Sequence, residues 1–138
     1  MAIDQAFFST WTPRAQALLR IVASFLFLQH ATAKFFGVPH VAYFDNLELL
    51  SLIGAAGAIE LVGGALLLIG LWARAAAFVL SGEMAFAYFI GHAARGQVLS
   101  PMLNQGEPAV LYCFIFLFLA AAGPGAWSVG AARSAAPA

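Results

Sequence analysis

Ionisable side chains lie within or beside each of the long apolar runs of this sequence, where charge is costly. A charge at the centre of a bilayer costs ~2.5–3.5 kcal/mol on insertion scales, so such residues face a protein interior and are functional candidates. Carboxylates and imidazoles in that setting can hold, release or relay protons. The candidates for a ligand site or cavity are His30, Lys34, Glu60, Glu83, His92 and Glu107.

Two of the carboxylates, Glu60 and Glu83, lie at the midpoints of consecutive apolar runs, residues 49–71 and 74–92. Because the connection around Trp72 is very short, the two runs must be antiparallel neighbours, and both carboxyls lie at similar depth. If they face each other, one holds a proton, because two close like charges cannot both ionise cheaply. A cation between them lets both stay charged. A purely structural role, with both glutamates paired to bases, has equal weight.

The first apolar run supplies the cations. Arg20, His30 and Lys34 recur at helical spacing, so they share one face of a helix. His92 and Glu107 lie near the same membrane boundary as Lys34, whereas Arg20 lies near the opposite one. The polar interior is therefore predicted to open from mid-membrane towards one side only. The candidates for structural ion pairs are Arg20 and Arg74.

His30 and His92 have the chemistry of haem or metal ligands, but their placement disfavours both. Imidazoles that bind haem within a helical bundle must face one another at matched depth, whereas His30 lies within the membrane and His92 at its margin. No tight ligand spacing links them to the glutamates, so we predict no metal site. The single cysteine, Cys113, cannot form an internal disulfide.

The elements that must position these groups are four apolar runs. Of the 138 residues, 63% are hydrophobic and 9% charged, against ~45–50% and ~25% in soluble domains. A soluble fold of this size could not bury so much apolar surface, and long runs without alternation indicate helices rather than barrel strands. We predict an all-α polytopic membrane protein, a four-transmembrane-helix bundle with spans at about 15–36, 49–71, 74–92 and 107–122.

Basic and aromatic residues indicate the orientation of this bundle. Arginines and all three tryptophans fall on the side of both termini, and the three tyrosines fall towards the other side, as interfacial belts. We therefore place both termini in the cytoplasm. Residues 1–128 are predicted to form one domain, followed by a disordered tail at 129–138. The net charge is zero, so the chain lacks the excess of basic residues that is typical of nucleic-acid-binding proteins.

Several short motifs follow one another in order along the chain. They are Arg20, His30-Ala31-Thr32-Ala33-Lys34, Glu60-Leu61-Val62-Gly63-Gly64, Asn104-Gln105-Gly106-Glu107 and Gly123-Pro124-Gly125-Ala126-Trp127-Ser128. Together they resemble the DoxX family of small bacterial four-helix membrane proteins. The resemblance implies the bacterial inner membrane and adds Asn104 to the cavity candidates. Family members often have glycine where this chain has Ala31 and Gln105. The larger side chains at both positions therefore add bulk where the chain is expected to pack closely.

The resemblance also implies redox chemistry, because relatives include a subunit of a thiosulfate:quinone oxidoreductase and partners of enzymes of oxidative and thiol stress. We expect a membrane subunit or anchor of a quinone- or thiol/sulfur-linked redox system, an oxidoreductase subunit rather than a complete enzyme. The sequence leaves the cofactor open, with a quinone as one candidate; protonatable groups beside its carbonyls would deliver protons. The expected partners are the lipid bilayer, a soluble or membrane redox enzyme and further copies of the chain.

Two other interpretations stay open. The chain could be a non-catalytic assembly or scaffold protein, in which the intramembrane charges only fix the register of the helices. It could also be a carrier of protons or small molecules, because intramembrane carboxylates and histidines are the usual parts of proton relays. The sequence assigns no catalytic residue under any of the three interpretations.

Overall fold

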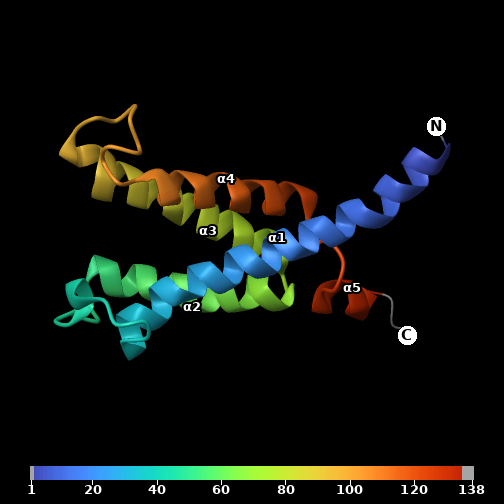
Figure 1. The fold of residues 1–138 in the computed structure, drawn as a ribbon. Coiled ribbons are helices and arrows are strands. Elements are labelled where there is room, and N and C mark those ends of the chain that lie inside the picture. Colours follow the sequence, from blue (N-terminus) through green and yellow to red (C-terminus); the bar gives the residue numbers. More distant parts are fainter. Residues whose placement is uncertain (1, 135–138) are drawn as a thin grey trace.

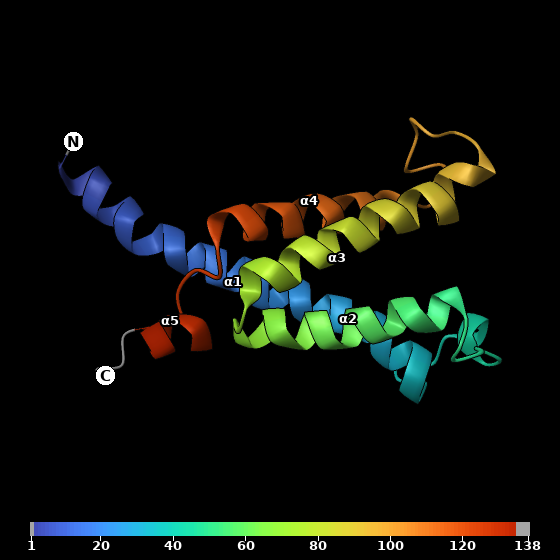
Figure 2. The ribbon, with the colours of Figure 1, turned by 180° about the vertical axis from the view of Figure 1, so that it is seen from behind.

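The chain folds into two antiparallel pairs of helices. The computed structural model describes residues 2–134, and within them it contains helices and no strand. The long helices are α1 (Ala2–Phe36), α2 (Leu52–Ile69), α3 (Ala73–Ala87) and α4 (Glu107–Ala122). Figures 1 and 2 show α1 against α2 and α3 against α4, with a tight turn joining the pairs. The predicted all-α class is confirmed.

Two helical segments are long and apolar enough to cross a membrane. They are α2 and the segment Ala73–Arg95, in which α3 continues through a turn of π-helix (Tyr88–His92) and a turn of 3-10 helix (Ala93–Arg95). α4 is apolar but shorter, at 16 residues. α1 has 35 residues and begins well before the predicted segment 15–36. Pro13 lies inside this helix, which continues through it.

Local signals set the ends of α2. The Ser51 hydroxyl caps its first turn by accepting a hydrogen bond from the Gly54 N–H at 3.1 Å. At the other end Gly70 has a φ of +73°, a left-handed conformation that glycine adopts without strain. α3 then begins at Ala73, so the connection is too short for anything but an antiparallel pair. This turn sets Glu60 of α2 and Glu83 of α3 at comparable depth.

Arg20 of α1 ties together one end of the bundle, which we call the closed end (residues 70–73 and 123–128, with Arg20). Its side chain is fully buried, with 0% exposed. It donates hydrogen bonds to the carbonyl oxygens that end α2 and to those of the segment after α4. The acceptors are the oxygens of Leu67 (2.9 Å), Leu68, Pro124 (2.8 Å), Ala126 (3.4 Å) and Trp127 (2.9 Å).

Arg74 has a similar role at the end of α4. Its guanidinium donates to the backbone oxygens of Ala120 at 3.0 Å, Ala122 at 3.2 Å, and Ala121. The last carbonyls of a helix lack intrahelical donors and carry the negative end of its dipole, so a cation is favourable there. The ion pairs predicted for Arg20 and Arg74 are therefore wrong, because within residues 2–134 neither side chain contacts a carboxylate.

The segment after α4 also differs from the predicted disordered tail, since it begins with a short helix, α5 (Val129–Ser134). The Ala131 N–H donates to the Ser128 hydroxyl at 3.2 Å, and the Gly130 N–H donates to the Gly70 oxygen at 3.1 Å. Alanine has the highest helix propensity, so this small-residue composition supports a helix once it docks on α2. Residues 135–138 of the predicted tail lie outside the described residues.

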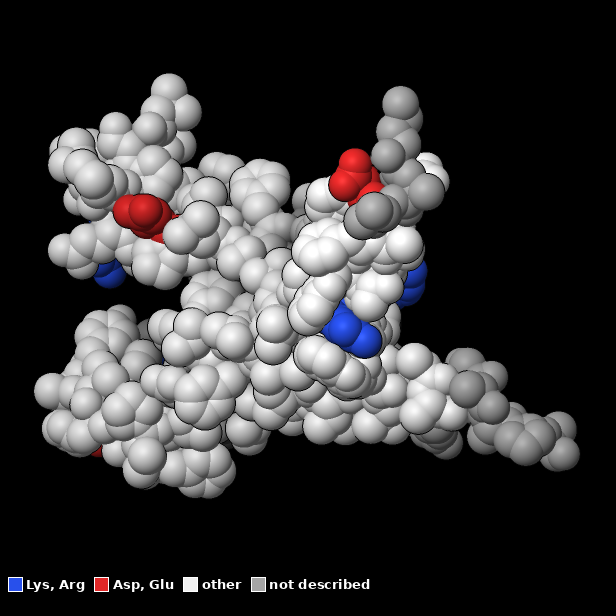
Figure 3. All heavy atoms as spheres, turned by 45° about the vertical axis from the view of Figure 1, so that its right-hand side comes forward, with Lys and Arg blue, Asp and Glu red and all other residues white. Residues whose placement is uncertain are grey.

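At the opposite end, which we call the open end, the two helix pairs diverge. Figures 1 and 2 show them separating towards the connecting segments 37–51 and 93–106. Figure 3 shows a surface with few charged side chains and a notch between two lobes on this side. The fully buried apolar side chains that join the pairs include Phe27, Leu80 and Phe116. The bundle is thus a wedge, closed by Arg20 at one end and open at the other.

Candidate functional site

A buried ion pair joins α1 to α2 in the open half of the bundle. Lys34 Nζ donates to both carboxylate oxygens of Glu60, each at 2.6 Å, and the two side chains are 8% and 5% exposed. Gly57, one turn before Glu60, makes room for the lysine, because a Cβ there would lie 3.0 Å from Lys34 Cδ. The ring of Phe44 covers the ammonium group at 5.8 Å. The pair is therefore desolvated and held from several sides.

Glu83 of α3 completes this ionic cluster. Both of its carboxyl oxygens are buried, and neither has a hydrogen-bond partner among the described residues. Glu60 repels and Lys34 attracts a charge on Glu83, so the three groups act on one another electrostatically. A buried carboxyl group that is charged and has no donor is costly. Glu83 is thus the one acid of the cluster that a proton or a ligand donor would satisfy.

His30 connects the ionic cluster to an aromatic wall. It lies one helical turn before Lys34, and the charges of Lys34 and Glu60 both act on it. Its ring meets the ring of Tyr112 edge-on, with centroids 6.2 Å apart and an interplanar angle of 87°. Phe27 lies 6.0 Å from His30 and 5.2 Å from Tyr112 between ring centroids. The open half therefore presents protonatable groups beside flat apolar surfaces.

A cavity of about 260 Å³ lies among α1, α3 and α4 at this point. A second cavity of about 310 Å³ extends towards the segment 37–51 and shares His30 and Tyr112 with the first. Within the described part of the chain, no three His, Cys, Asp or Glu side chains are grouped to hold a metal ion. The polar lining of the first cavity comes from His30, His92, Gln105 and Tyr112.

Asn104 has a structural position and does not line this cavity, contrary to the prediction. Its side-chain amide donates to the Tyr88 hydroxyl and to the Gln97 oxygen, both at 3.2 Å, and its Oδ1 accepts from the Gly106 N–H at 2.9 Å. Tyr88, expected in an interfacial belt, is buried and donates to the Val98 oxygen at 2.6 Å. Together they fix the segment 93–106 over the end of α3.

Replacing Asn104 with alanine should therefore loosen this segment without affecting the ionic cluster. The Gly106 N–H would keep its bond to the Pro101 oxygen and the Tyr88 hydroxyl its bond to the Val98 oxygen, so each hydrogen bond lost with the Asn104 amide should cost about 0.5–1.5 kcal/mol. Limited trypsin digestion of the purified protein should then cut faster after Arg95, which is exposed. Asn46→Ala, in the exposed part of the other connecting segment, is the matched control. Equal cleavage of all three proteins would contradict this role for Asn104.

The two remaining candidates lie in different places. His92 Nδ1 is 3.1 Å from the Asn104 backbone oxygen, and its ring stacks at 6.5 Å on Tyr88 while also lining the first cavity. Glu107 is the first residue of α4, where a carboxylate suits the helix dipole, and it borders a groove between α1 and α4. The structure thus brings His30, Lys34, Glu60 and Glu83 within electrostatic reach of one another. Of these four, His30 lines the first cavity together with His92, and Lys34, Glu60 and Glu83 do not line it.

Comparisons with known proteins agree with the motifs in the sequence. The sequence profile of the DoxX family matches residues 15–93. The chain belongs to the DoxX family. A relative from Haemophilus influenzae, described as an uncharacterized protein, is 43% identical over 123 residues, which cover 84% of this chain and 88% of that protein. No solved structure matches the chain significantly. Membership of this membrane-associated family accords with the two apolar segments long enough to span a bilayer.

The structure adds Gln105 and Tyr112 to the candidate residues of this DoxX protein. Gln105 has a φ of +61°, a left-handed conformation that favours glycine. This explains why a glycine suits that position of the motif, and here the longer side chain reaches the cavity. A larger residue where the family often has glycine was therefore a sequence feature that could have identified Gln105 as a candidate site residue. Tyr112 gave no comparable signal, because ordinary packing accounts for an aromatic residue in an apolar helix.

Proposed function

We propose that this DoxX protein is a four-span protein of the bacterial inner membrane whose open end binds a quinone as a membrane subunit or anchor of a redox system. The two further spans would be α4 and the part of α1 that follows Pro13. A 16-residue α4 is ~24 Å long, slightly less than the ~30 Å hydrocarbon core, so it would tilt little. Both termini would lie in the cytoplasm with the closed end.

The exposed surfaces of α1 and α4 support this placement in lipid. On α1, Phe25 is 59% exposed, and on α4, Phe114 and Phe118 are 64% and 50% exposed. Large apolar side chains at such exposure suit contact with acyl chains rather than water. All three tryptophans are exposed near the closed end, where an interfacial belt would place them.

The quinone proposal depends mainly on the surroundings of His30, which lines the cavity. On one side His30 is influenced by the charges of Lys34 and Glu60, and on the other it contacts the rings of Phe27 and Tyr112. Reducing a quinone to a quinol adds two electrons and two protons. The electrons would come from a partner redox enzyme. The protons would reach the carbonyl oxygens through His30, which lines the cavity, and Glu83, whose carboxyl oxygens have no donor within the described residues, would hold a proton behind it. Tyr112 and Phe27 would flank the flat ring.

The test is to purify the protein in a mild detergent, identify retained quinones by mass spectrometry, and measure thermal unfolding with added quinone. We expect retained quinone and an unfolding temperature that rises with quinone concentration, because a ligand that binds the folded state stabilises it. His30→Gln and Glu83→Gln should each reduce that rise. His40→Gln changes an exposed histidine paired with Asp45 at 2.9 Å and is the matched control. No retention and no shift would overturn the proposal.

A second candidate, a non-catalytic assembly protein, is favoured by the buried Lys34–Glu60 pair, since such a pair fixes the register of α1 against α2. Under this candidate the protein would co-purify with a redox enzyme but ignore quinones. Glu83→Gln would then leave complex formation intact, because its carboxyl group bonds to no described residue.

A further inference from the structure

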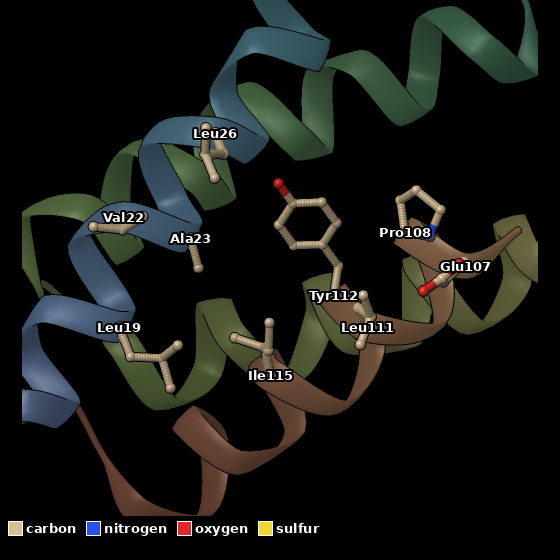
Figure 4. A pocket seen from close by; sticks show the side chains of 9 residues that line it. All are labelled: Leu19, Val22, Ala23, Leu26, Glu107, Pro108, Leu111, Tyr112 and Ile115. Carbon is tan, nitrogen blue, oxygen red and sulfur yellow. The ribbon is translucent and has the colours of Figure 1, made fainter.

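A groove lies on the outer surface of the bundle between α1 and α4. The two helices pack mainly against α2 and α3 respectively and leave between them a space of about 460 Å³. Figure 4 shows apolar side chains from both helices along its walls. They include Leu19, Val22 and Leu26 on α1 and Leu111, Tyr112 and Ile115 on α4. From Leu19 to Leu26 the groove follows about two helical turns, or ~10 Å.

The Tyr112 side chain lines both this groove and the two polar cavities that contain His30. Its ring stacks on Phe116 at 5.5 Å, which fixes its plane. Figure 4 shows its hydroxyl projecting into the space between α1 and α4. The groove therefore adjoins the proposed quinone site at Tyr112, and a chain that ran from one to the other would pass beside this side chain.

The aliphatic lining of the groove favours an apolar ligand over a polar one. Along the two turns of α1 the groove offers only aliphatic side chains, and its one charged group, Glu107, lies at the end next to Pro108. A polar or charged molecule would find no partner along most of this length. An apolar chain would fill it by van der Waals contact, which drives packing in lipid, where burial from water gives no gain.

We propose that the ligand of this protein carries a long isoprenoid or alkyl tail, and that the groove between α1 and α4 holds the first part of that tail. The inference rests on the proposed quinone site and adds the tail, its binding surface and its route. The polar ring lies beside His30, the chain passes Tyr112 and leaves along Val22 and Leu111, and the rest extends into the bilayer. The ligand enters sideways from the membrane.

The experiment compares two benzoquinones, one without a tail and one with a decyl chain, on the full-length protein in nanodiscs. Val22→Trp and Leu111→Trp fill the groove from opposite walls, and both positions are more than half exposed, at 53% and 55%. Leu18→Trp on α1 and Leu117→Trp on α4 are the matched controls, because both are exposed apolar positions outside the groove. Dissociation constants are measured by titrating quinone at a fixed lipid concentration, so membrane partitioning cancels between variants.

We expect the two groove variants to weaken binding of the decyl quinone by about tenfold or more, the size of effect that a small steric change in an apolar pocket produces. Binding of the tail-less quinone should stay unchanged, and the controls should match the wild type. If the groove variants leave decyl binding intact, or weaken both quinones equally, the tail site is overturned while the quinone site stands. If neither quinone binds the wild type, the proposed function fails first. A phospholipid as sole occupant would leave both constants unchanged.

Discussion

Replacing Lys34 with methionine should lower the free energy of unfolding by about 3–5 kcal/mol, as expected when one member of a buried ion pair is removed. The lysine donates to both carboxylate oxygens of Glu60 at 2.6 Å, and the pair is almost fully buried. Without the lysine, Glu60 keeps no donor among the described residues, and its charge acts on Glu83 with no compensating cation. Glu60→Met should have an effect of similar size, because it leaves the ammonium group buried and unpaired.

The double variant Lys34→Met/Glu60→Met should recover most of this loss, since apolar side chains can replace a buried pair at little cost. Unfolding in mixed micelles, followed by circular dichroism, gives the coupling energy through a double-mutant cycle. The exposed pair His40–Asp45, with side chains 70% and 51% exposed, is the control and should show almost no coupling. A coupling near zero for Lys34 and Glu60 would mean that their contact does not hold α1 to α2.

The same double variant separates structure from function. If it folds but no longer binds quinone, the pair belongs to the ligand site as well as to the fold. If it folds and still binds, the pair only fixes the register of α1 against α2, and His30 and Glu83 carry the site. From the amino-acid sequence alone these two interpretations have equal weight, because a charged residue in an apolar run is consistent with both.

Residue type and helical spacing indicated that His30, Lys34, Glu60 and Glu83 lie in one half of the helix bundle, but not where Asn104 and Glu107 lie. Glu60 and Glu83 had to lie at similar depth because the connection between α2 and α3 is so short. His30 and Lys34 had to share a face because they are one turn apart. The partner of Lys34 could not be assigned, since the register of α1 against α2 depends on the segment 37–51, which has no periodic pattern.

The errors have a common physical origin, because a sequence displays charged side chains but not the backbone groups that they can bind. Arg20 and Arg74 were assigned carboxylate partners, whereas the carbonyl oxygens at the ends of α2 and α4 bind them. Asn104 was placed in the cavity, whereas it bonds to the backbone of its own segment. These roles depend on where helices end and how turns are shaped.

Arg20 is the residue whose loss should damage the closed end most. Its five acceptors belong to α2 and to the segment that follows α4, and its side chain is fully buried. A hydrogen bond from a charged group contributes about 1.5–3 kcal/mol, so losing even two of them should lower the free energy of unfolding by about 3–6 kcal/mol. Arg20→Met should thus leave several buried carbonyls without donors.

Arg20→Lys tests whether the shape of the guanidinium matters beyond its charge. A lysine ammonium has one donor centre and cannot bridge α2 and the 124–127 segment with a planar fork, so we expect an intermediate loss. Arg14→Met is the control, because the Arg14 guanidinium lies over the Trp11 ring at 5.0 Å and, unlike that of Arg20, donates to no carbonyl oxygen among the described residues. Unfolding in mixed micelles measures all three variants. If Arg20→Met unfolds like the wild type, packing at Phe27, Leu80 and Phe116 is sufficient to hold the two helix pairs together. The hydrogen bonds of Arg20 would then not be needed for the closed end.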